Sequence, residues 1–292
     1  MISNVNAGAC TGRAQYDDWM LRTLDALRRS SHPGPTFLVT TVAVVLGVGA
    51  NLDVWRIVVV GLVILLDQLS VGWSNDWIDS ARDREVGRAD KPVATGEISP
   101  TLVRNAALIG AALSVLVSIP LGWLAVLVHA VFLASAWSYN LWLKNTPVSV
   151  LPFIVSFGLL PLIVTVSATD PAAAAPWALG AGALLGVAAH FSNVLPDLEA
   201  DLATGIQGLP HRLGATASGV VIAGALAAAS GLLLIGSPDP LHVAGFAAGL
   251  AVAVAILVLV LDRRRTRLLF QLIMAAAVID VLLLAVGGSG LV

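Results

Sequence analysis

The stretch WRIVVVGLVILLDQLSVGWSNDWIDSARD, residues 55–83, decides the class of fold. Residues 55–73 are mostly apolar and are long enough to cross a hydrocarbon core of about 30 Å as a helix. Polar residues then take over, and Asn75, Asp79 and Asp83 recur at every fourth position. If the helix continues out of the membrane, this spacing places the three side chains on one face. The stretch therefore predicts a transmembrane helix that ends in an acidic stripe.

The whole chain has the composition of a membrane protein. Its 292 residues are 58% hydrophobic and 12% charged, whereas soluble domains are about 45–50% apolar and about 25% charged. The apolar runs of the required length must be helices, because open sheets cannot cross lipid. We therefore expect an all-α polytopic membrane protein with nine transmembrane helices. The predicted spans are 36–52, 55–73, 102–119, 121–139, 148–168, 176–192, 215–235, 241–261 and 267–287.

The basic residues indicate the orientation of these spans. Short cytoplasmic loops retain Lys and Arg, and with a cytosolic N-terminus all of the 16 Lys and Arg residues except Arg56 fall on the inner side. We expect a cytosolic N-terminal segment over 1–35, which contains an amphipathic surface helix, and a nine-helix domain over 36–292. A net charge of -2 and a pI of about 6.2 argue against a nucleic-acid partner, because such binding needs a clustered basic surface.

The acidic residues are concentrated in two inner loops. Residues 75–100 and 193–212 hold half of the 18 Asp and Glu residues. The pattern N-x3-D-x3-D-x3-G-x4-P-x3-G occurs in both, first from Asn75 and again from Asn193, as a parallel internal repeat requires. Pro196 makes the helical spacing less secure in the second copy, because proline breaks a helix interior. We interpret the two copies as half-sites around one pocket.

Two facing acidic stripes repel each other unless a cation lies between them. Oxygen ligands select a hard divalent ion, and Mg²⁺ is usually held by one or two carboxylates together with substrate phosphates. The acids therefore predict Mg²⁺ and a phosphorylated substrate. The alternative is a pair of solvated loops whose acids pair with their basic neighbours, which leaves the shared spacing unexplained. Those neighbours serve better as counter-charges to a diphosphate; they are Arg82, Arg84, Arg88 and Lys91.

At these residues the sequence resembles the UbiA family of intramembrane prenyltransferases. The run NDWIDSARD from Asn75 fits the family pattern NDxxDxxxD, and KPVATG follows from Lys91. DLEADLATGIQGLP from Asp197 fits the second pattern, DxxxD, and YNLWLK from Tyr139 to Lys144 resembles the family's Tyr-x4-Lys. Nine spans with two acidic cytosolic loops match the family architecture. The resemblance therefore covers nearly the whole chain and implies nine helices around a central cavity.

The resemblance implies a Mg²⁺-dependent transferase of prenyl groups in the cell membrane, with its active site toward the cytosol. Family members bind a polyprenyl diphosphate, ionise its allylic C–O bond and pass the cation to an acceptor, which we expect to be lipophilic and aromatic. By motif match, the catalytic residues are Asp79, Asp83, Asp197 and Asp201, and the metal ligands are these four with Asn75. The diphosphate-binding residues are Arg82, Arg84, Lys91 and Lys144. Further pocket candidates are Asp67, Asp76, Tyr139, His190 and Asn193.

Two other functions stay open at this point. The first is a terpene cyclase of the same family, which uses no acceptor. The run AHFSNVLP from Ala189 to Pro196 favours it slightly, because members that act on 4-hydroxybenzoate usually carry Tyr-rich residues there. Among the transferases, the stretch from Asp197 to Pro210, with Gln207 where many members have Lys, is closer to the chlorophyll-synthase and homogentisate branches. The second is a secondary transporter, which would suit nine spans, an internal repeat and the intramembrane acids Asp67 and Asp280. Transporter sites lie near the bilayer midplane, however, and most acids here lie at the cytosolic boundary.

Overall fold

The computed structural model describes residues 19–203, 205–236 and 240–262, together with positions 275, 278–280, 282–283 and 290–291. The regular structure in these ranges is helical. The long helices are α2 (Pro33–Gly49), α3 (Val54–Glu85), α5 (Pro100–Ser118), α6 (Trp123–Leu141), α7 (Leu151–Val166), α8 (Pro176–Val194), α10 (Leu209–Gly236) and α11 (Pro240–Asp262). The short elements are α4 (Pro92–Thr95), α9 (Leu198–Ala203) and the 3-10 turns Ile119–Leu121, Leu143–Asn145 and Leu195–Asp197.

The long helices account for the first eight predicted spans, one helix to each span. The ninth, 267–287, falls largely outside the described residues. Five helices, α3, α5, α6, α8 and α10, are long and apolar enough to cross a membrane, and a sixth crossing results if the helix Trp19–Ser30 and α2, which meet at 66°, form one bent span. α7 and residues 243–256 of α11 are shorter apolar helices. The chain is therefore an all-α, multi-pass membrane protein, whereas the central cavity stays a prediction.

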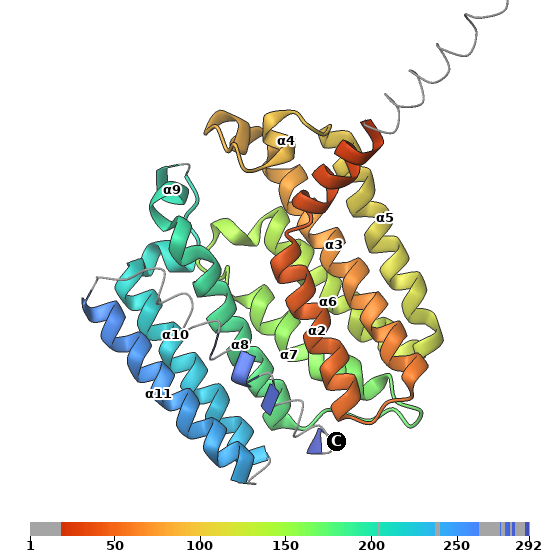
Figure 1. The fold of residues 1–292 in the computed structure, drawn as a ribbon, viewed down its shortest axis with the longest axis vertical. Coiled ribbons are helices and arrows are strands. Elements are labelled where there is room, and N and C mark those ends of the chain that lie inside the picture. The colour runs from red at the N-terminus through yellow and green to blue at the C-terminus, as the bar shows by residue number, and fades with distance from the viewer. Residues whose placement is uncertain are drawn as a thin grey trace, which may run out of the picture.

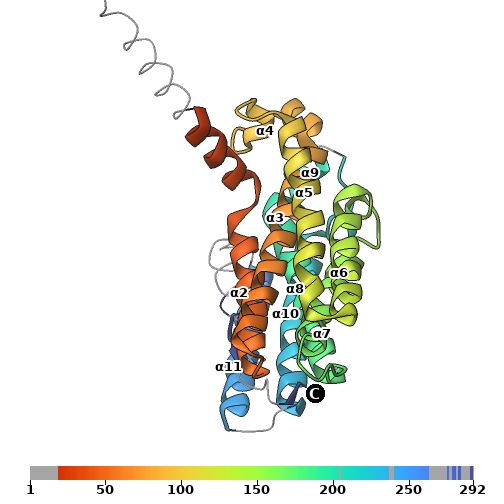
Figure 2. The ribbon, with the colours of Figure 1, turned by 90° about the vertical axis from the view of Figure 1, so that its right-hand side faces the viewer.

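The helices lie side by side along the long axis of the molecule, and α4 and α9 lie at the same end (Figures 1 and 2). Proline occupies the first turn of α2, α5 and α8, where its missing N–H costs no hydrogen bond. Ser99 caps α5, because its hydroxyl oxygen accepts from the N–H of Leu102 at 3.2 Å.

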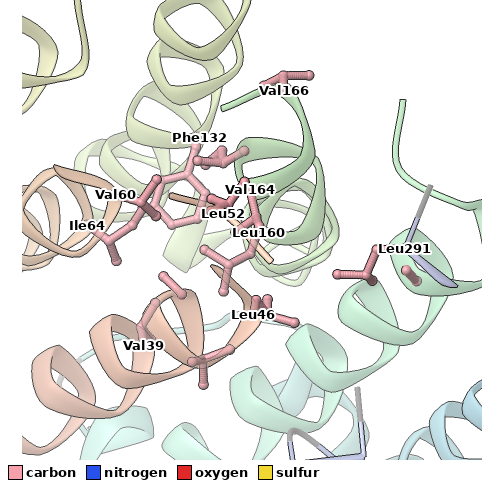
Figure 3. Close-up of a cluster of buried hydrophobic side chains, with 14 of the residues drawn as sticks. Val39, Leu46, Leu52, Val60, Ile64, Phe132, Leu160, Val164, Val166 and Leu291 are labelled. Atoms are coloured by element: carbon pink, nitrogen blue, oxygen red, sulfur yellow. The ribbon is translucent and has the colours of Figure 1, made fainter. Parts of the chain in front are cut away.

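An apolar core holds α2, α3, α6 and α7 together (Figure 3). Phe132, Val60 and Leu160 are buried there and gather between the helices. α7 and α8 approach each other closely because α8 carries glycine at the contact: a Cβ on Gly186 would collide with the main-chain carbonyl of Phe153. The polar side chains that carry the sequence motifs lie beyond this core, at the end of the bundle marked by α4 and α9.

Candidate active site

The first acidic stripe lies on the last turns of α3, which is one helix from Val54 to Glu85. Asp79 and Asp83 are 6% and 2% exposed, and Asp76 is also buried. Asn75 is half-buried. The predicted continuation of the helix past the apolar span is confirmed, and it carries the carboxylates into the protein interior. Buried carboxylates need charged or hydrogen-bonding partners, because burial without them is costly.

Lys91, which precedes α4, is buried between two of these carboxylates. Its Nζ lies 3.1 Å from Asp76 Oδ1 and 2.8 Å from Asp83 Oδ2. Burial alone would lower the pKa of Lys91, but the two carboxylates outweigh burial and raise the pKa above its usual value. Asp76 has a second partner in His32, at the bend before α2, whose Nε2 lies 3.1 Å from Oδ1. Lys91 therefore stays charged inside the protein.

Lys144 reaches the same stripe from a different part of the chain. It lies in the 3-10 turn after α6, is 8% exposed and forms an ion pair with Asp79. Arg82 lies 3.2 Å from both Asp79 Oδ2 and Asp83 Oδ1. Burial lowers the pKa of Lys144, and Asp79 offsets only part of this effect. The positive charges of Arg82 and Lys91 lower the pKa of Lys144 further, whereas Lys91 has two carboxylate partners that raise its own pKa.

The two copies of the repeat end their helices in the same way. Gly87 and Gly205 have φ angles of 70° and 83°. The equivalent closing hydrogen bond is present in each copy, from Arg88 N–H to Asp83 C=O (2.9 Å) and from Ile206 N–H to Asp201 C=O (3.0 Å). These bonds belong to a Schellman cap, which favours glycine because L side chains avoid a positive φ. The repeated glycines therefore have a structural reason, and the caps turn the chain sharply after each acidic stripe.

The second acidic stripe is interrupted, in contrast to the first. The 3-10 turn Leu195–Asp197 separates α8 from α9. This turn is wound more tightly than an α-helix, and Pro196 lacks an N–H, so the regular helix is interrupted between Asn193 and Asp197. Asn193 and Asp197 are both exposed, and Asp201 is half-buried. In the second half-site Asp197 therefore faces solvent, whereas Asp201 is partly shielded from it.

Arg88 connects the two stripes electrostatically. It donates two hydrogen bonds of 2.9 Å to Asp90, which raise the pKa of Arg88 most, and the charges of Asp197 and Asp83 raise it further. Asp83 belongs to the first stripe and Asp197 to the second. Charges from both stripes therefore act on Arg88.

Tyr139, near the end of α6, directly precedes Asn140, which accepts a hydrogen bond from Asn75 of the first stripe. Its ring is edge-on to Phe153 on α7, with centroids 5.1 Å apart, and to His190 on α8, with centroids 5.7 Å apart. Aromatic ring faces attract cations. Residues of three helices therefore form an aromatic cluster near the end of α6.

Two of the predicted site residues lie apart from this cluster. Arg84 is exposed and donates to the main-chain carbonyl of Val93 at 3.5 Å. Asp67 is fully buried on α3, about 18 Å along the helix from Asp79 at 1.5 Å per residue. Its Oδ1 lies 3.4 Å from His129 Nε2. Asp67 thus belongs to the interior of the bundle rather than to its polar end.

Three residues that the sequence motifs did not select contact the site. His32 contacts Asp76, as described above, and His211 Nε2 lies 3.2 Å from Asp201 Oδ2. Asn140 accepts a hydrogen bond of 3.3 Å from Asn75. His32 and His211 have no local signal, because neither lies in a recognisable pattern. Asn140 lies inside YNLWLK, so its place in that motif was a usable signal.

The first stripe offers the oxygen donors that Mg²⁺ prefers. Within the described ranges, no three Asp, Glu, His or Cys side chains converge closely enough to hold a metal ion by themselves. Asp79, Asp83 and the amide oxygen of Asn75 are hard oxygen donors, and each of them contacts a lysine ammonium group. These positions therefore accept positive charge. They fit Mg²⁺ held jointly with phosphate oxygens.

The fold is similar to that of several solved structures. A UbiA homolog from Archaeoglobus fulgidus bound to GPP and Mg²⁺ has a TM-score of 0.70 and 16% identity, over 91% of this chain and 99% of that chain. An apo UbiA homolog from Aeropyrum pernix K1 has a TM-score of 0.68 and 19% identity, over 85% and 95% of the two chains. A structure of digeranylgeranylglyceryl phosphate synthase gives 0.70 and 14%, over 91% and 99%. No curated protein matches the sequence.

Fold and site together define a polytopic α-helical membrane protein with buried, charge-paired acids at one end of its bundle. The model of the UbiA prenyltransferase family matches residues 36–290. The chain belongs to the UbiA prenyltransferase family, and the resemblance indicated by its motifs is confirmed.

Proposed function

We propose that this protein is a Mg²⁺-dependent prenyltransferase that ionises a polyprenyl diphosphate and transfers the prenyl group to a lipophilic, aromatic acceptor. The observation that carries the proposal is the set of buried ion pairs on α3, where Lys91 and Lys144 reach Asp83 and Asp79 from separate segments. Family membership supports it, as does the similarity to a structure that holds GPP and Mg²⁺.

The paired charges suit a diphosphate. The ammonium groups of Lys91 and Lys144 can bind phosphate oxygens, while Asp79 and Asp83 exchange their lysine partners for a divalent cation. When bound, Mg²⁺ would neutralise charge on the departing diphosphate. In this proposal the ring of Tyr139, in the aromatic cluster near the end of α6, faces the developing allylic cation, and the apolar interior of the bundle keeps water away from that cation.

We place this site on the cytosolic side of the membrane. The segments at the site end carry Arg84, Arg88, Lys91 and Lys144, whereas Arg56 lies at the opposite end of α3. Cytoplasmic loops are the ones that retain positive charge. The expected localisation is the cell membrane, with the diphosphate supplied from the cytosol.

The proposal is tested by diphosphate release from the purified full-length protein in detergent. Geranyl, farnesyl and geranylgeranyl diphosphates are supplied with and without Mg²⁺, and with and without a phenolic or quinoid acceptor. We expect Mg²⁺-dependent release that requires an acceptor and that falls about 100-fold or more in Asp79→Asn. Asp53→Asn is the matched control, because Asp53 is exposed at the opposite end of α3.

Other results would change the assignment. A discrete cyclic product formed without acceptor would make the protein a terpene cyclase. Absence of release from every prenyl diphosphate would overturn the proposal.

A further inference from the structure

Asn140, on α6, is 2% exposed, and its side chain makes three hydrogen bonds to α3. Its Nδ2 donates to the main-chain carbonyl of Val71 at 2.9 Å and to Ser74 Oγ at 2.8 Å. Its Oδ1 accepts from Asn75 Nδ2 at 3.3 Å. Both ends of the Asn140 amide are therefore engaged between the two helices.

Chemistry decides the direction of these hydrogen bonds. A main-chain carbonyl only accepts, so the atom of Asn140 that faces Val71 must be the amide nitrogen. The hydroxyl of Ser74 donates to the same carbonyl at 2.8 Å, which leaves the Ser74 oxygen to accept from Asn140. The oxygen of Asn140 then faces Asn75, and Asn75 has to turn its own amide nitrogen toward it.

This arrangement determines what Asn75 presents to the site. With Nδ2 turned toward Asn140, Oδ1 of Asn75 faces Lys91, whose Nζ lies at 3.4 Å. A flipped amide would point N–H groups at that ammonium group and at any other cation in its place, which is unfavourable. A directional chain of hydrogen bonds thus runs from the backbone of α3 to the cationic side of the site.

We infer that Asn140 is a positioning residue that holds the oxygen of Asn75 toward the cation-binding side of the site. The inference rests on the proposed function, in which that oxygen takes part in binding Mg²⁺. Asn140 acts through Asn75 and does not touch the substrate. Trp137 offers a matched control, because its Nε1 donates to Ser70 Oγ at 3.1 Å. That bond ties the same two helices without involving Asn75.

The test is the affinity for Mn²⁺, measured by electron paramagnetic resonance on the full-length protein in detergent. Geranyl S-thiolodiphosphate, a substrate analogue that resists ionisation, is present throughout. Asn140→Leu should weaken Mn²⁺ binding by about 10- to 100-fold, the usual range for losing a partner that orients a metal ligand. Trp137→Phe should leave the affinity unchanged. Equal affinity in wild type and Asn140→Leu would overturn the inference.

A second substitution separates orientation from helix packing. A carboxylate presents oxygen on either side, so Asn75→Asp needs no orienting partner. Asn140→Leu should therefore weaken Mn²⁺ binding in the wild-type background and cause no loss in the Asn75→Asp background, where the oxygen of Asn140 faces a carboxylate oxygen instead of an N–H. This is a non-additive result in a double-mutant cycle. If Asn140 only held α6 against α3, the loss would be the same in both backgrounds, and the inference would be wrong.

Asn140→Ser is measured in parallel, so that failure of Asn140→Leu to fold does not end the test. A serine hydroxyl is too short to reach both Val71 and Asn75, and the same loss of affinity is expected. Folding is checked by elution volume and thermal unfolding. A wild-type protein that binds no Mn²⁺ with the analogue would overturn the proposed function along with this inference. A wild type that binds as tightly as both Asn140 variants would overturn the inference alone.

Discussion

Lys144→Met removes one positive charge from the site and keeps most of the volume of the side chain. Lys144 is 8% exposed, and its ammonium group pairs with Asp79. A hydrogen bond to a charged group contributes about 1.5–3 kcal/mol. If Lys144 binds a phosphate oxygen, its loss should weaken binding of a prenyl diphosphate by about 10- to 100-fold, since about 1.4 kcal/mol corresponds to a factor of ten.

The same substitution should strengthen binding of a divalent cation. Asp79 keeps Arg82 at 3.2 Å but loses its buried lysine, so less of its charge is compensated. Mn²⁺ added without diphosphate should therefore bind Lys144→Met more tightly than wild type. Opposite effects on the two ligands distinguish a lysine that pairs with diphosphate from one that only supports the fold.

Two titrations on purified protein in detergent measure these effects. Mn²⁺ binding is followed by electron paramagnetic resonance without diphosphate, and geranyl S-thiolodiphosphate binding by calorimetry at saturating Mg²⁺. Arg104→Met, an exposed position near the start of α5, controls for the change in net charge. If neither affinity changes in Lys144→Met, Lys144 is only a structural partner of Asp79 and the reasoning is refuted.

The lowered pKa of Lys144 adds a pH dependence to this experiment. Burial holds this pKa below its ordinary value of 10.5. The lysine is charged below its pKa, so the affinity for diphosphate should fall as the pH rises, beginning below pH 10.5. Lys144→Arg should remove this fall, because arginine stays charged throughout.

Two further predictions concern stability, and both are checked by thermal unfolding in detergent. Gly186→Ala should cost about 1–3 kcal/mol, because the new Cβ would collide with the Phe153 carbonyl, whereas a Cβ on Gly224 meets nothing within 4 Å and Gly224→Ala should be tolerated. The hydrogen bonds from Arg88 lower the pKa of Asp90 to about 2. Because the pair is exposed, it should contribute less than about 1 kcal/mol to the free energy of unfolding. This contribution should be lost only as the pH falls from 3.8 toward 2. The Tm difference between wild type and Asp90→Asn should accordingly close over that range, and a difference that persists at pH 2 would contradict it.

The helices were predictable from the sequence because lipid imposes a minimum length on an apolar run. The N-terminal amphipathic helix was predicted too, and Trp19 and Leu21 of the helix Trp19–Ser30 are exposed. Its packing was not predictable. Ala26 is buried in a cluster with Val93 and Val103, and a contact between residues so far apart in sequence leaves no local pattern.

The identity of the main site residues was predictable, because these residues lie in the sequence motifs. The acidic spacing and the Lys-containing motifs selected Asp79, Asp83, Lys91 and Lys144, and the structure brings these four together. Their pairing was not predictable, because it depends on how the 3-10 turn after α6 approaches α3. The YNLWLK motif marked the position of Asn140 but not its role, because that role depends on the direction of hydrogen bonds between two helices, which composition and spacing do not encode.

The two half-sites of the repeat end in the same helix cap, but their acidic side chains differ in burial. Substitutions in the two half-sites should therefore have different effects on stability and similar effects on activity. Asp83 is 2% exposed and pairs with buried Lys91, so Asp83→Asn should cost about 3 kcal/mol, the low end for breaking a buried pair, because Lys91 keeps Asp76. Asp197 is exposed, so Asp197→Asn should change the unfolding free energy by less than about 0.5 kcal/mol. Both substitutions should nevertheless reduce Mg²⁺-dependent diphosphate release strongly, because each removes a proposed ligand from the shared site. Thermal unfolding without ligands, set beside the release assay, checks both parts. Full release activity in Asp197→Asn would show that the second stripe is a solvated loop, and that the first stripe binds the metal and diphosphate alone.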